Sequence, residues 1–316
     1  MGPLLFIIFI NDLPEVCREI NNIFLYADDA KLFRHVNTQS DNLTLQDMIN
    51  KLQSWTEKWQ LNLNVDKCVT VSYGRQVDKS HSYYLRRESV DCTLIRLDSF
   101  KDLGVTFQSD LSFKIHINNQ INKANSMLGI IKRNFRDIKQ DAFIMLYKSL
   151  VRSHLEYANS VWSPYRIQDI EALEKVQKRA TKLISSLKHS SYEERLRILN
   201  LPTLKFRRLR GDMIEVYKIL TGIYDSSVTP KLNLSSDSIT RGNSLKIINR
   251  RCHYDLRKYS FCNRVTNLWN SLPEAVVTAQ SLNIFKNRLD KHWINQDVVY
   301  DWHGEISGTG SRSNIS

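Results

Sequence analysis

The spacing of apolar residues changes about one third of the way along the chain. Before residue 110, short apolar runs such as 23–26 and 30–36 are typical of strands that are covered on both faces. The segment 61–73 alternates apolar and polar residues, and 82–97 and 100–107 predict further short strands. This part of the chain therefore favours a sheet.

Two helices are expected among these strands. The apolar run 3–13 predicts a buried helix that is closed by Pro14. Between residues 41 and 60, apolar residues recur at three- and four-residue steps, which predicts an amphipathic helix. Thr44 and Asp47 have the spacing of a capping box for its start.

From about Phe113 the helical period takes over. The predicted helices cover 117–131, 142–151, 170–187, 192–199 and 204–220. The order of strands and then helices predicts an α+β domain at 1–110, followed by a helical region at 111–231. The polar composition after it predicts a linker at 232–244, a small carboxy-terminal region at 245–300 and a disordered tail at 301–316.

Charge divides the chain at the same place. Residues 1–110 hold 12 basic and 15 acidic residues, whereas 111–316 hold 33 and 18, a net charge of +15. Such a basic half suggests a polyanionic partner, of which nucleic acid is the usual one, although solvated helix faces explain the charge equally well. The aromatic residues Tyr147 and Trp162 fit the helical period, so we expect both to be packed in the core.

The composition excludes several other classes of protein. Five scattered cysteines without a CxxC pair predict neither a disulfide framework nor a zinc ribbon. The apolar start lacks a basic region and a cleavage site, and no stretch approaches the roughly 20 apolar residues of a membrane span. We therefore expect an intracellular protein of the nucleus or cytoplasm that does not act at a membrane.

Two adjacent carboxylates, Asp28 and Asp29, lie between the apolar runs IFLY and AKLF. Neighbouring like charges repel, and an apolar setting strengthens the repulsion. A solvated turn would tolerate the pair, and this is the commoner situation for aspartates. Alternatively, a divalent cation held between strand ends would neutralise it, because Mg²⁺ binds one or two protein carboxylates together with phosphate oxygens. From the residues around Asp28 and Asp29 alone, both the solvated turn and the cation site remain open.

Several segments together resemble the reverse transcriptase of non-LTR (LINE-like, jockey-type) retrotransposons. They are GPLLFIIFINDLP, LYADDAKLF, LQSWTEKWQLNLNVDKC, FKDLGVTFQSDLSFKIHI and YSFCNRVTNLWNSLPEAVVTAQSLNIFKNRL, in the family's order. The resemblance implies part of a right-hand polymerase palm, with antiparallel strands and packing helices, at 1–110. It also implies a helical thumb at 111–231. The activity implied is RNA-directed DNA polymerisation with two Mg²⁺ ions, an RNA template, a DNA primer and deoxynucleoside triphosphates.

The family's roles pass to matching positions of this chain. Asp28 would be the principal metal ligand and Asp29 a supporting carboxylate. Tyr26 would lie against the primer end, and Ala27 would keep the hairpin slim. Lys67 would assist departure of pyrophosphate, although a solvated lysine explains it equally well.

The thumb side of the resemblance involves glycine and cationic residues. Gly104 would grip the primer, or it is simply a turn glycine. Exposed cations would contact the phosphates of the template–primer duplex; the predicted contacts are Lys132, Arg133, Arg136 and Lys139. The groups QKRATK (177–182) and KFRRLR (205–210) would add to them.

The family's first palm motif and fingers would lie upstream of GPLLF, in a further amino-terminal portion of the polyprotein. Because that motif supplies another metal-binding aspartate, we expect this chain alone to be inactive. Two other functions are compatible with the sequence: a non-enzymatic nucleic-acid-binding remnant, and a maturase-like RNA-binding splicing cofactor.

Overall fold

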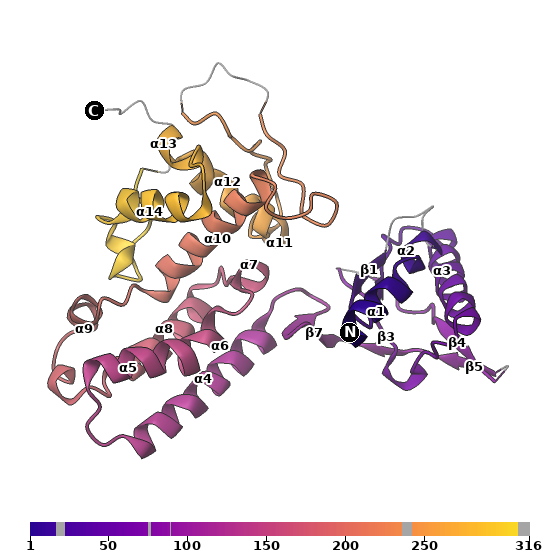
Figure 1. Ribbon diagram of the computed structural model, residues 1–316, viewed down its shortest axis with the longest axis horizontal. Helices are drawn as coiled ribbons and strands as arrows, with labels where there is room; N and C mark the ends of the chain where they lie inside the picture. The colour runs from indigo at the N-terminus through magenta and orange to yellow at the C-terminus, as the bar shows by residue number, and fades with distance from the viewer. Residues whose placement is uncertain (17–22, 75–76, 89, 236–241, 309–316) are drawn as a thin grey trace. The chain divides into compact units, whose positions relative to one another are not determined.

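The chain forms two compact units. The computed structural model describes residues 1–16, 23–74, 77–88, 90–235 and 242–308. The first unit comprises 1–101 and 107–111, and the second comprises 102–106 and the chain from 112 onward. The first unit combines short sheets with helices and the second unit is mainly helical, so the chain has the predicted α+β character (Figure 1).

The first unit combines one long helix with two-stranded sheets. Its helices are α1 (Gly2–Ile10), α2 (Leu13–Val16), α3 (Gln39–Lys58) and the 3₁₀ turn η1 (Val65–Lys67). Its strands are β1 (Ile23–Tyr26), β2 (Asp29–Leu32), β3 (Val69–Val71), β4 (Tyr84–Arg87), β5 (Val90–Thr93) and β6 (Ile95–Leu97). Two further strands, β7 (Ser99–Asp102) and β8 (Val105–Gln108), each have residues in both units, and the turn between them belongs to the second.

The pairing of these strands departs in part from the antiparallel arrangement that the sequence predicted. β1–β2 and β4–β5 are antiparallel hairpins, and β7 pairs with β8. β3 and β6, however, run parallel. The β4–β5 hairpin lies between them in the chain, and the chain returns from it in the direction of β3. The predicted strand at 61–73 is also shorter than expected, because only Val69–Val71 is extended and 65–67 turns.

One face of α3 carries the core of the first unit. Leu52 and Trp55 are buried against Ile10 and Leu13, with partly buried residues of β1 and β2 around them. Ile49 is buried against a second cluster, formed by Tyr83 and Leu85. α3 therefore holds both the β1–β2 and the β4–β5 hairpin through one apolar stripe.

Two glutamines of α3 also bind the backbone of β4. The side chain of Gln46 donates to the carbonyl oxygen of Tyr84 at 2.9 Å and accepts from its N–H at 3.1 Å. Gln53, two turns later, makes the same pair of bonds to Arg86 at 2.5 and 2.9 Å. These bonds satisfy polar groups at the edge of β4, which fixes the hairpin to the helix.

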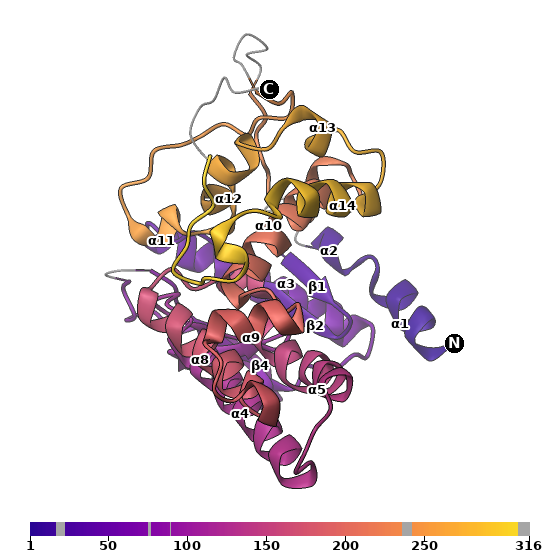
Figure 2. The same cartoon turned by 90° about the vertical axis from the view of Figure 1, so that its left-hand side faces the viewer.

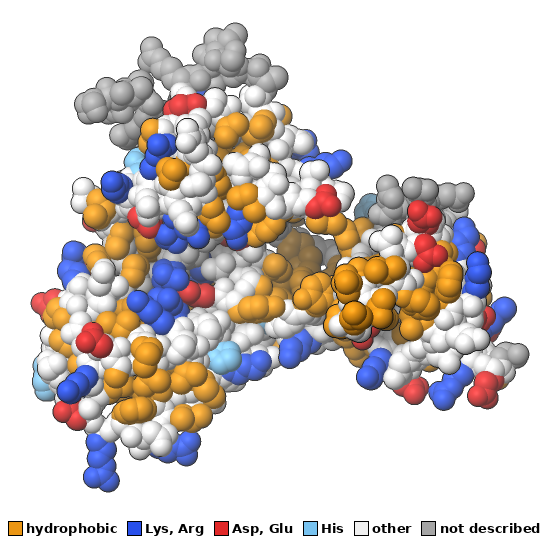
Figure 3. All heavy atoms as spheres, viewed as in Figure 1, with side chains coloured by type: hydrophobic (Ala, Val, Ile, Leu, Met, Phe, Trp, Pro, Cys, Tyr) orange, Lys and Arg blue, Asp and Glu red, His pale blue; other side chains and the backbone are white. Residues whose placement is uncertain are grey.

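The amino-terminal helices correct two predictions. α1 ends at Ile10, and Pro14 lies in the first turn of α2, where the missing N–H leaves no hydrogen bond unmade. α1 is also largely exposed rather than buried, because Leu4, Leu5, Ile7 and Ile8 are 59–64% exposed. Their apolar side chains form part of an orange surface in Figure 3.

The start of α3 corrects a third prediction. The capping box is formed by Thr38 and Asp41, and not by Thr44 and Asp47. The carboxylate of Asp41 accepts from the backbone N–H and the hydroxyl of Thr38, both at 2.9 Å. The backbone N–H of Asn37 donates to Asp41 at 3.1 Å, and Arg34 donates at 2.8 Å. The bond from Asn37, followed by those from Thr38 and Arg34, holds the pKa of Asp41 well below its usual range. The helix consequently begins at Gln39, two residues before the predicted range, and its cap lies six residues before the predicted one.

The second unit is helical. Its α-helices are α4 (Lys114–Asn134), α5 (Gln140–Leu146), α6 (Ser153–Glu156), α7 (Asn159–Trp162), α8 (Ile167–Thr181), α9 (Tyr192–Leu199), α10 (Leu204–Leu220), α11 (Asp255–Lys258), α12 (Phe261–Asn270), α13 (Glu274–Val277) and α14 (Leu282–Trp293). A π-helical turn, η2 (Tyr147–Arg152), joins α5 to α6, and the 3₁₀ turns are η3 (Ser185–Leu187) and η4 (Asp297–Val299). No helix in the described ranges is both long and apolar enough to span a membrane.

α10 occupies the middle of this unit, between α8 on one side and α12 and α14 on the other (Figure 1, Figure 2). Its Met213 and Tyr217 pack in one apolar cluster with Trp269, Phe285 and Trp293. The expected burial of Tyr147 and Trp162 is confirmed, since both side chains are buried.

The described parts of the predicted linker and tail are packed rather than loose. Leu234 forms an isolated bridge with Ile247, and the buried amide of Asn243 donates to two carbonyl oxygens, at 3.2 and 2.9 Å. In the tail, Ile306 is buried in the apolar cluster around α10. Lys205 donates to the carbonyl oxygen of Gly304 at 2.8 Å. Residues 236–241 and 309–316 lie outside the described ranges.

Candidate functional site

The paired carboxylates lie at the tip of the β1–β2 hairpin. Tyr26 pairs with Asp29 in antiparallel register, so Ala27 and Asp28 form a two-residue turn. Asp29 therefore begins β2, whereas the sequence predicted it within the turn. Asp28 and Asp29 are both exposed, and their oxygens are accessible to a cation or a substrate.

Ala27 adopts a strained backbone conformation in this turn. Its φ of 52° lies in the left-handed region, which costs an L-residue about 1–2 kcal/mol relative to its preferred conformations. A methyl group is the smallest side chain other than that of glycine, so the tip is narrow. Strain of this kind clusters at functional sites, which is consistent with a working role for the hairpin.

The hairpin is half-covered by the core of its own unit. Ile23 and Leu25 pack on the cluster around Leu52 and Trp55, whereas Phe24 and Tyr26 are exposed on the opposite face. The prediction of strands covered on both faces is thus wrong for the described chain, and β2 ends at residue 32 instead of 36. Because buried and exposed residues alternate along β1, one face of the hairpin is fixed to the core and the other face is open to solvent.

The donor set at the tip fits a hard divalent cation. Carboxylate oxygens are the ligands that Mg²⁺ prefers, and one or two of them suffice when phosphate oxygens complete the shell. Among the described residues, no group of three or more His, Cys, Asp or Glu side chains is placed to hold a metal. A cation at Asp28 and Asp29 would therefore need further ligands, such as phosphate oxygens, to complete its shell.

Lys67 ends the turn η1 and is exposed. Val65 and Cys68 beside it pack on the cluster that also receives Leu32 of β2. Within the described contacts, the ammonium of Lys67 makes no hydrogen bond or ion pair with Asp28 or Asp29. The turn that carries Lys67 and strand β2 of the hairpin thus pack on the same apolar cluster, but the lysine side chain does not contact the two aspartates in the described structure.

The conformation and surroundings of residue 104 explain why it is a glycine. Leu103 and Gly104 have φ values of 42° and 86°, as a tight two-residue hairpin turn of the I′ type requires. A Cβ atom at Gly104 would lie 3.0 Å from Cε1 of Tyr157. The hydroxyl of Tyr157 donates to the carbonyl oxygen of Leu103 at 2.9 Å. The β7–β8 turn is therefore seated on the tyrosine ring.

His116 is a second support of this hairpin, and our sequence analysis missed it. Its Nδ1 accepts from the backbone N–H of Thr106 at 3.2 Å, and its ring packs edge-on against Trp162. Burial, together with the charge of Lys123, lowers the pKa of His116 to about 4, so the ring is neutral at physiological pH. The sequence did contain a signal for this role, because His116 and Gln120 are spaced four residues apart and so lie on the same buried face of the helix.

The predicted phosphate-contacting cations lie at the junction of α4 and α5. We call Lys132, Arg133, Arg136 and Lys139 the α4–α5 cluster; all four are exposed. Lys132 and Arg133 occupy the last turn of α4, where positive charge also favours the helix dipole. The described contacts include no ion pair for any member of the cluster. Its charge is therefore available to a polyanion.

The group KFRRLR does not have the predicted role. Lys205 pairs with Glu305 at 2.6 Å, Arg207 with Glu156, and Arg210 with Asp290 at 2.5 Å. Arg208 is buried, and its pKa is lowered by the loss of hydration. These cations lie on α10, whose faces are covered by neighbouring helices, so they stabilise the unit instead of facing solvent.

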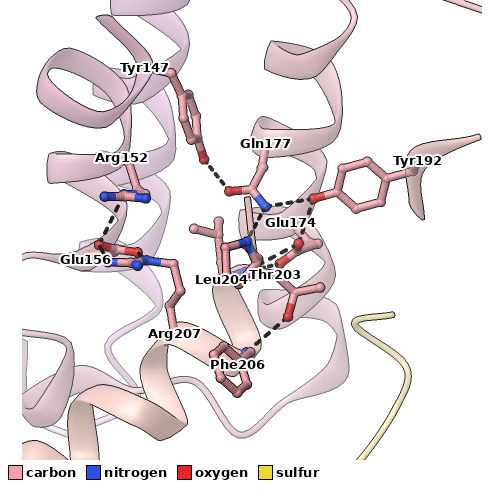
Figure 4. A network of polar contacts seen from close by, with 11 residues as sticks. Tyr147, Arg152, Glu156, Glu174, Gln177, Tyr192, Thr203, Leu204, Phe206 and Arg207 are labelled. Carbon is pink, nitrogen blue, oxygen red and sulfur yellow. Dashed lines mark hydrogen bonds and ion pairs between the residues drawn. The ribbon is translucent and has the colours of Figure 1, made fainter. Parts of the chain in front are cut away.

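A buried polar network joins η2, α8 and α9 to the first residue of α10 (Figure 4). Glu174 of α8 accepts from the backbone N–H of Leu204, the first residue of α10, at 3.1 Å, and from the hydroxyl of Tyr192 at 2.6 Å. Gln177 continues the chain of bonds to the hydroxyl of Tyr147 at 2.5 Å. Burial raises the pKa of both Glu174 and Tyr192. The network belongs to the packing of four helical segments.

The β1–β2 hairpin lies in a segment that is similar to a known protein family. A model of the reverse transcriptase (RNA-dependent DNA polymerase) family matches residues 1–107, a range that includes Asp28 and Asp29. The exposed carboxylates thus lie within this matched segment, which we call the reverse transcriptase segment, and most of the helical unit lies beyond it.

Two related proteins support the jockey-type resemblance. The RNA-directed DNA polymerase from mobile element jockey of Drosophila melanogaster is 31% identical over 127 residues, which cover 38% of this chain and 13% of that protein. Its counterpart from Drosophila funebris is 25% identical over 232 residues, which cover 69% of this chain and 24% of that protein. The chain spans less than a quarter of either relative. No solved structure matches it.

Proposed function

We propose that the chain is part of an RNA-directed DNA polymerase of a non-LTR retrotransposon, in which Asp28 and Asp29 bind Mg²⁺. The observation that carries the proposal is the hairpin itself, with two exposed carboxylates beside a strained turn inside the reverse transcriptase segment. The left-handed conformation at Ala27 is the one that a two-residue hairpin turn requires, so the exposure of both carboxylates and their place in the matched segment support the proposal.

The residues around the hairpin take distinct roles in this proposal. Bound Mg²⁺ would supply charge stabilisation and activation of a primer hydroxyl in nucleotidyl transfer. Tyr26, 64% exposed on the open face, contacts the primer end, and Ala27 leaves room for the duplex. Lys67 neutralises departing pyrophosphate from an exposed position.

Residues 1–110 act as part of a palm and 111–231 as a thumb in the same proposal. The substrates are an RNA template, a DNA primer and deoxynucleoside triphosphates. The α4–α5 cluster contacts the phosphates of the template–primer duplex, which carries no base information. Its four exposed cations, at the ends of two helices, support this role.

Binding of an RNA–DNA hybrid duplex tests the thumb role. If four to six phosphates are neutralised, log affinity falls with log salt at a slope of roughly −4 to −5. The triple variant Arg133→Ala, Arg136→Ala and Lys139→Ala lowers that slope by about one to three and leaves sequence preference unchanged. Lys231→Ala, Lys286→Ala and Lys291→Ala together remove the same charge elsewhere and serve as the control. Equal effects of both triple variants would show that only net charge matters.

Primer extension tests the catalytic role. Two carboxylates are too few protein ligands for two metal ions, so we expect no templated nucleotide addition by this chain alone with Mg²⁺. Templated addition that disappears in Asp28→Asn would prove this expectation wrong and would still place the chemistry at the hairpin. Addition that survives in Asp28→Asn would refute the assigned role of Asp28.

A further inference from the structure

A second cationic surface lies in the helical unit, far along the chain from the reverse transcriptase segment. It is formed by 250–259, which includes α11, together with Tyr165 and Arg166 before α8; we call it the α11 surface. Tyr165 and Tyr259 stack at its base with ring centroids 4.4 Å apart and planes 5° apart. The guanidinium of Arg166 lies 5.7 Å from the ring of Tyr165, and the ammonium of Lys258 lies 5.2 Å from that of Tyr259.

The α11 surface is held rigidly from below. Arg264 of α12 forms an ion pair with the buried Asp212 of α10 at 2.9 Å and donates to the carbonyl oxygen of Ser160 at 2.6 Å. The amide of Asn263 donates to the carbonyl oxygen of Arg257 at 2.7 Å, which closes the end of α11. The stacked tyrosines and these bonds fix α11 against the segment before α8, so the surface is preorganised for a ligand.

Four exposed cations of this surface lie within residues 250–259. They are Arg250, Arg251, Arg257 and Lys258. In the part of the chain that the structure describes, none of these four forms an ion pair. Asp255 is the one acidic residue in the sequence from 250 to 259. The cations of KFRRLR, by contrast, are held in ion pairs or buried. A ligand of the α11 surface should therefore be anionic.

An exposed aromatic residue restricts the class of anionic ligand further. Tyr254, in the middle of the cationic stretch, is 67% exposed. A duplex keeps its bases stacked inside, whereas an unpaired strand can place a base on a tyrosine ring or on a guanidinium plane. An acidic protein segment would use the cations and gain little from the ring.

We propose that the α11 surface binds single-stranded nucleic acid, with its phosphates on Arg250, Arg251 and Arg257 and a base on Tyr254. This site is separate from the α4–α5 cluster and does not depend on the polymerase proposal. Both RNA and DNA strands have the required chemistry, because the contacts involve phosphates and base faces and not the 2′-hydroxyl.

Fluorescence anisotropy on the whole chain tests this site with labelled 12-mer oligo(U), 12-mer oligo(dT) and a duplex of the same length. We expect both single strands to bind, and Tyr254→Ala to weaken them by about 5- to 100-fold while Tyr254→Phe retains binding. Arg250→Ala with Arg251→Ala should lower the salt slope by about 1.4, which corresponds to about two phosphates of a single strand.

Matched variants separate the two sites. The α4–α5 triple variant should leave single-strand binding intact, and Tyr254→Ala should leave duplex binding intact. Tyr254 is exposed, so its substitution should not disturb folding, which circular dichroism checks. Unchanged single-strand binding in Tyr254→Ala would overturn the proposal. Competition by polyglutamate that matches competition by oligo(U) would overturn it in favour of an acidic protein partner.

Discussion

The two units place their charged residues in opposite ways. In the first unit, Asp28 and Asp29 stand exposed on a strained turn above a core of a few buried residues. In the second unit, Glu174, Arg208 and Asp212 are buried among helices. Exposed charge is available for chemistry or binding, whereas buried charge must be compensated by partners and contributes to the architecture.

The contrast applies within the second unit as well. Some of its basic residues bond to buried or neighbouring carboxylates, and others face solvent without an ion pair in the described structure. The first kind gathers on α10, and the second gathers in the α4–α5 cluster and on the α11 surface. Net charge along the sequence therefore overstates the cationic area that is available to nucleic acid.

Removing a buried carboxylate should break the second unit most severely. Asp212→Ala leaves the guanidinium of Arg264, 14% exposed, without its ion-pair partner, and we expect a loss of about 3–5 kcal/mol in the free energy of unfolding. Glu171→Ala removes an exposed partner of Lys175 on α8 and should have little effect. Urea unfolding followed by circular dichroism compares the two. Equal losses would mean that burial does not distinguish these pairs.

Substitution of a glycine sharpens the account of the β7–β8 turn. Gly104→Ala places a Cβ atom 3.0 Å from Tyr157 at a φ of +86°, and we expect a loss of about 1–3 kcal/mol. Gly129→Ala in α4 is the matched control, since no atom lies within 4 Å of the added Cβ. That substitution should stabilise the helix by about 1 kcal/mol. A Gly104→Ala protein as stable as the parent would remove the steric argument.

The free energy of unfolding should depend on pH through His116, which supports the same β7–β8 hairpin. Its folded-state pKa of about 4 lies below the ordinary value of 6.5, so the unfolded chain binds a proton first as pH falls. The contribution is complete above pH 6.5 and is lost progressively between 6.5 and 4. His116→Asn retains an acceptor for the N–H of Thr106 without this titration and should flatten the profile in that window. His189→Asn, at an exposed position, should leave it unchanged.

The smallest expected effect concerns the first unit. Ala27→Gly relieves a left-handed φ of 52°, and we expect a gain of about 0.5–1 kcal/mol after the entropy of glycine is counted. Ala30→Gly in β2 should destabilise the hairpin by a similar amount. Amide hydrogen exchange of β1 and β2 reads out both. Faster exchange in Ala27→Gly than in the parent protein would contradict the assignment of strain to this turn.

The sequence predicted best where one local rule acts alone. The helical period placed α9 and α10 at their observed bounds, 192–199 and 204–220, because regular apolar spacing over two or more turns has few alternatives. The start of α3 failed because two capping pairs of similar type lie six residues apart, and Arg34 favours the earlier one. The direction of β6 relative to β3 was also predicted wrongly. The two strands are distant in sequence and pair in parallel, and no local pattern in either strand specifies that pairing.

The candidate site was predicted in the same uneven way. Asp28 and Asp29 carry a local pattern and lie where a hairpin was expected. The ion pairs of Lys205, Arg207 and Arg210 join residues 51 to 100 positions apart, so nothing in the KFRRLR segment itself revealed them. His116 was missed because a histidine on an apolar helix face is usually a core residue, and its partner, Thr106, lies on a strand.

Metal-directed cleavage at the hairpin tests the central claim, that Asp28 and Asp29 form a cation site, most directly. Fe²⁺ in place of Mg²⁺, with a deoxynucleoside triphosphate to complete the metal shell and with ascorbate and peroxide, generates radicals that cut the backbone beside the bound ion. We predict cleavage within residues 26–29 that excess Mg²⁺ suppresses and that Asp28→Asn with Asp29→Asn abolishes. Asp47→Asn with Asp66→Asn, a pair of exposed carboxylates in the same unit, should leave it intact. Absence of cleavage at the hairpin, or its survival in the Asp28→Asn, Asp29→Asn protein, would contradict the account.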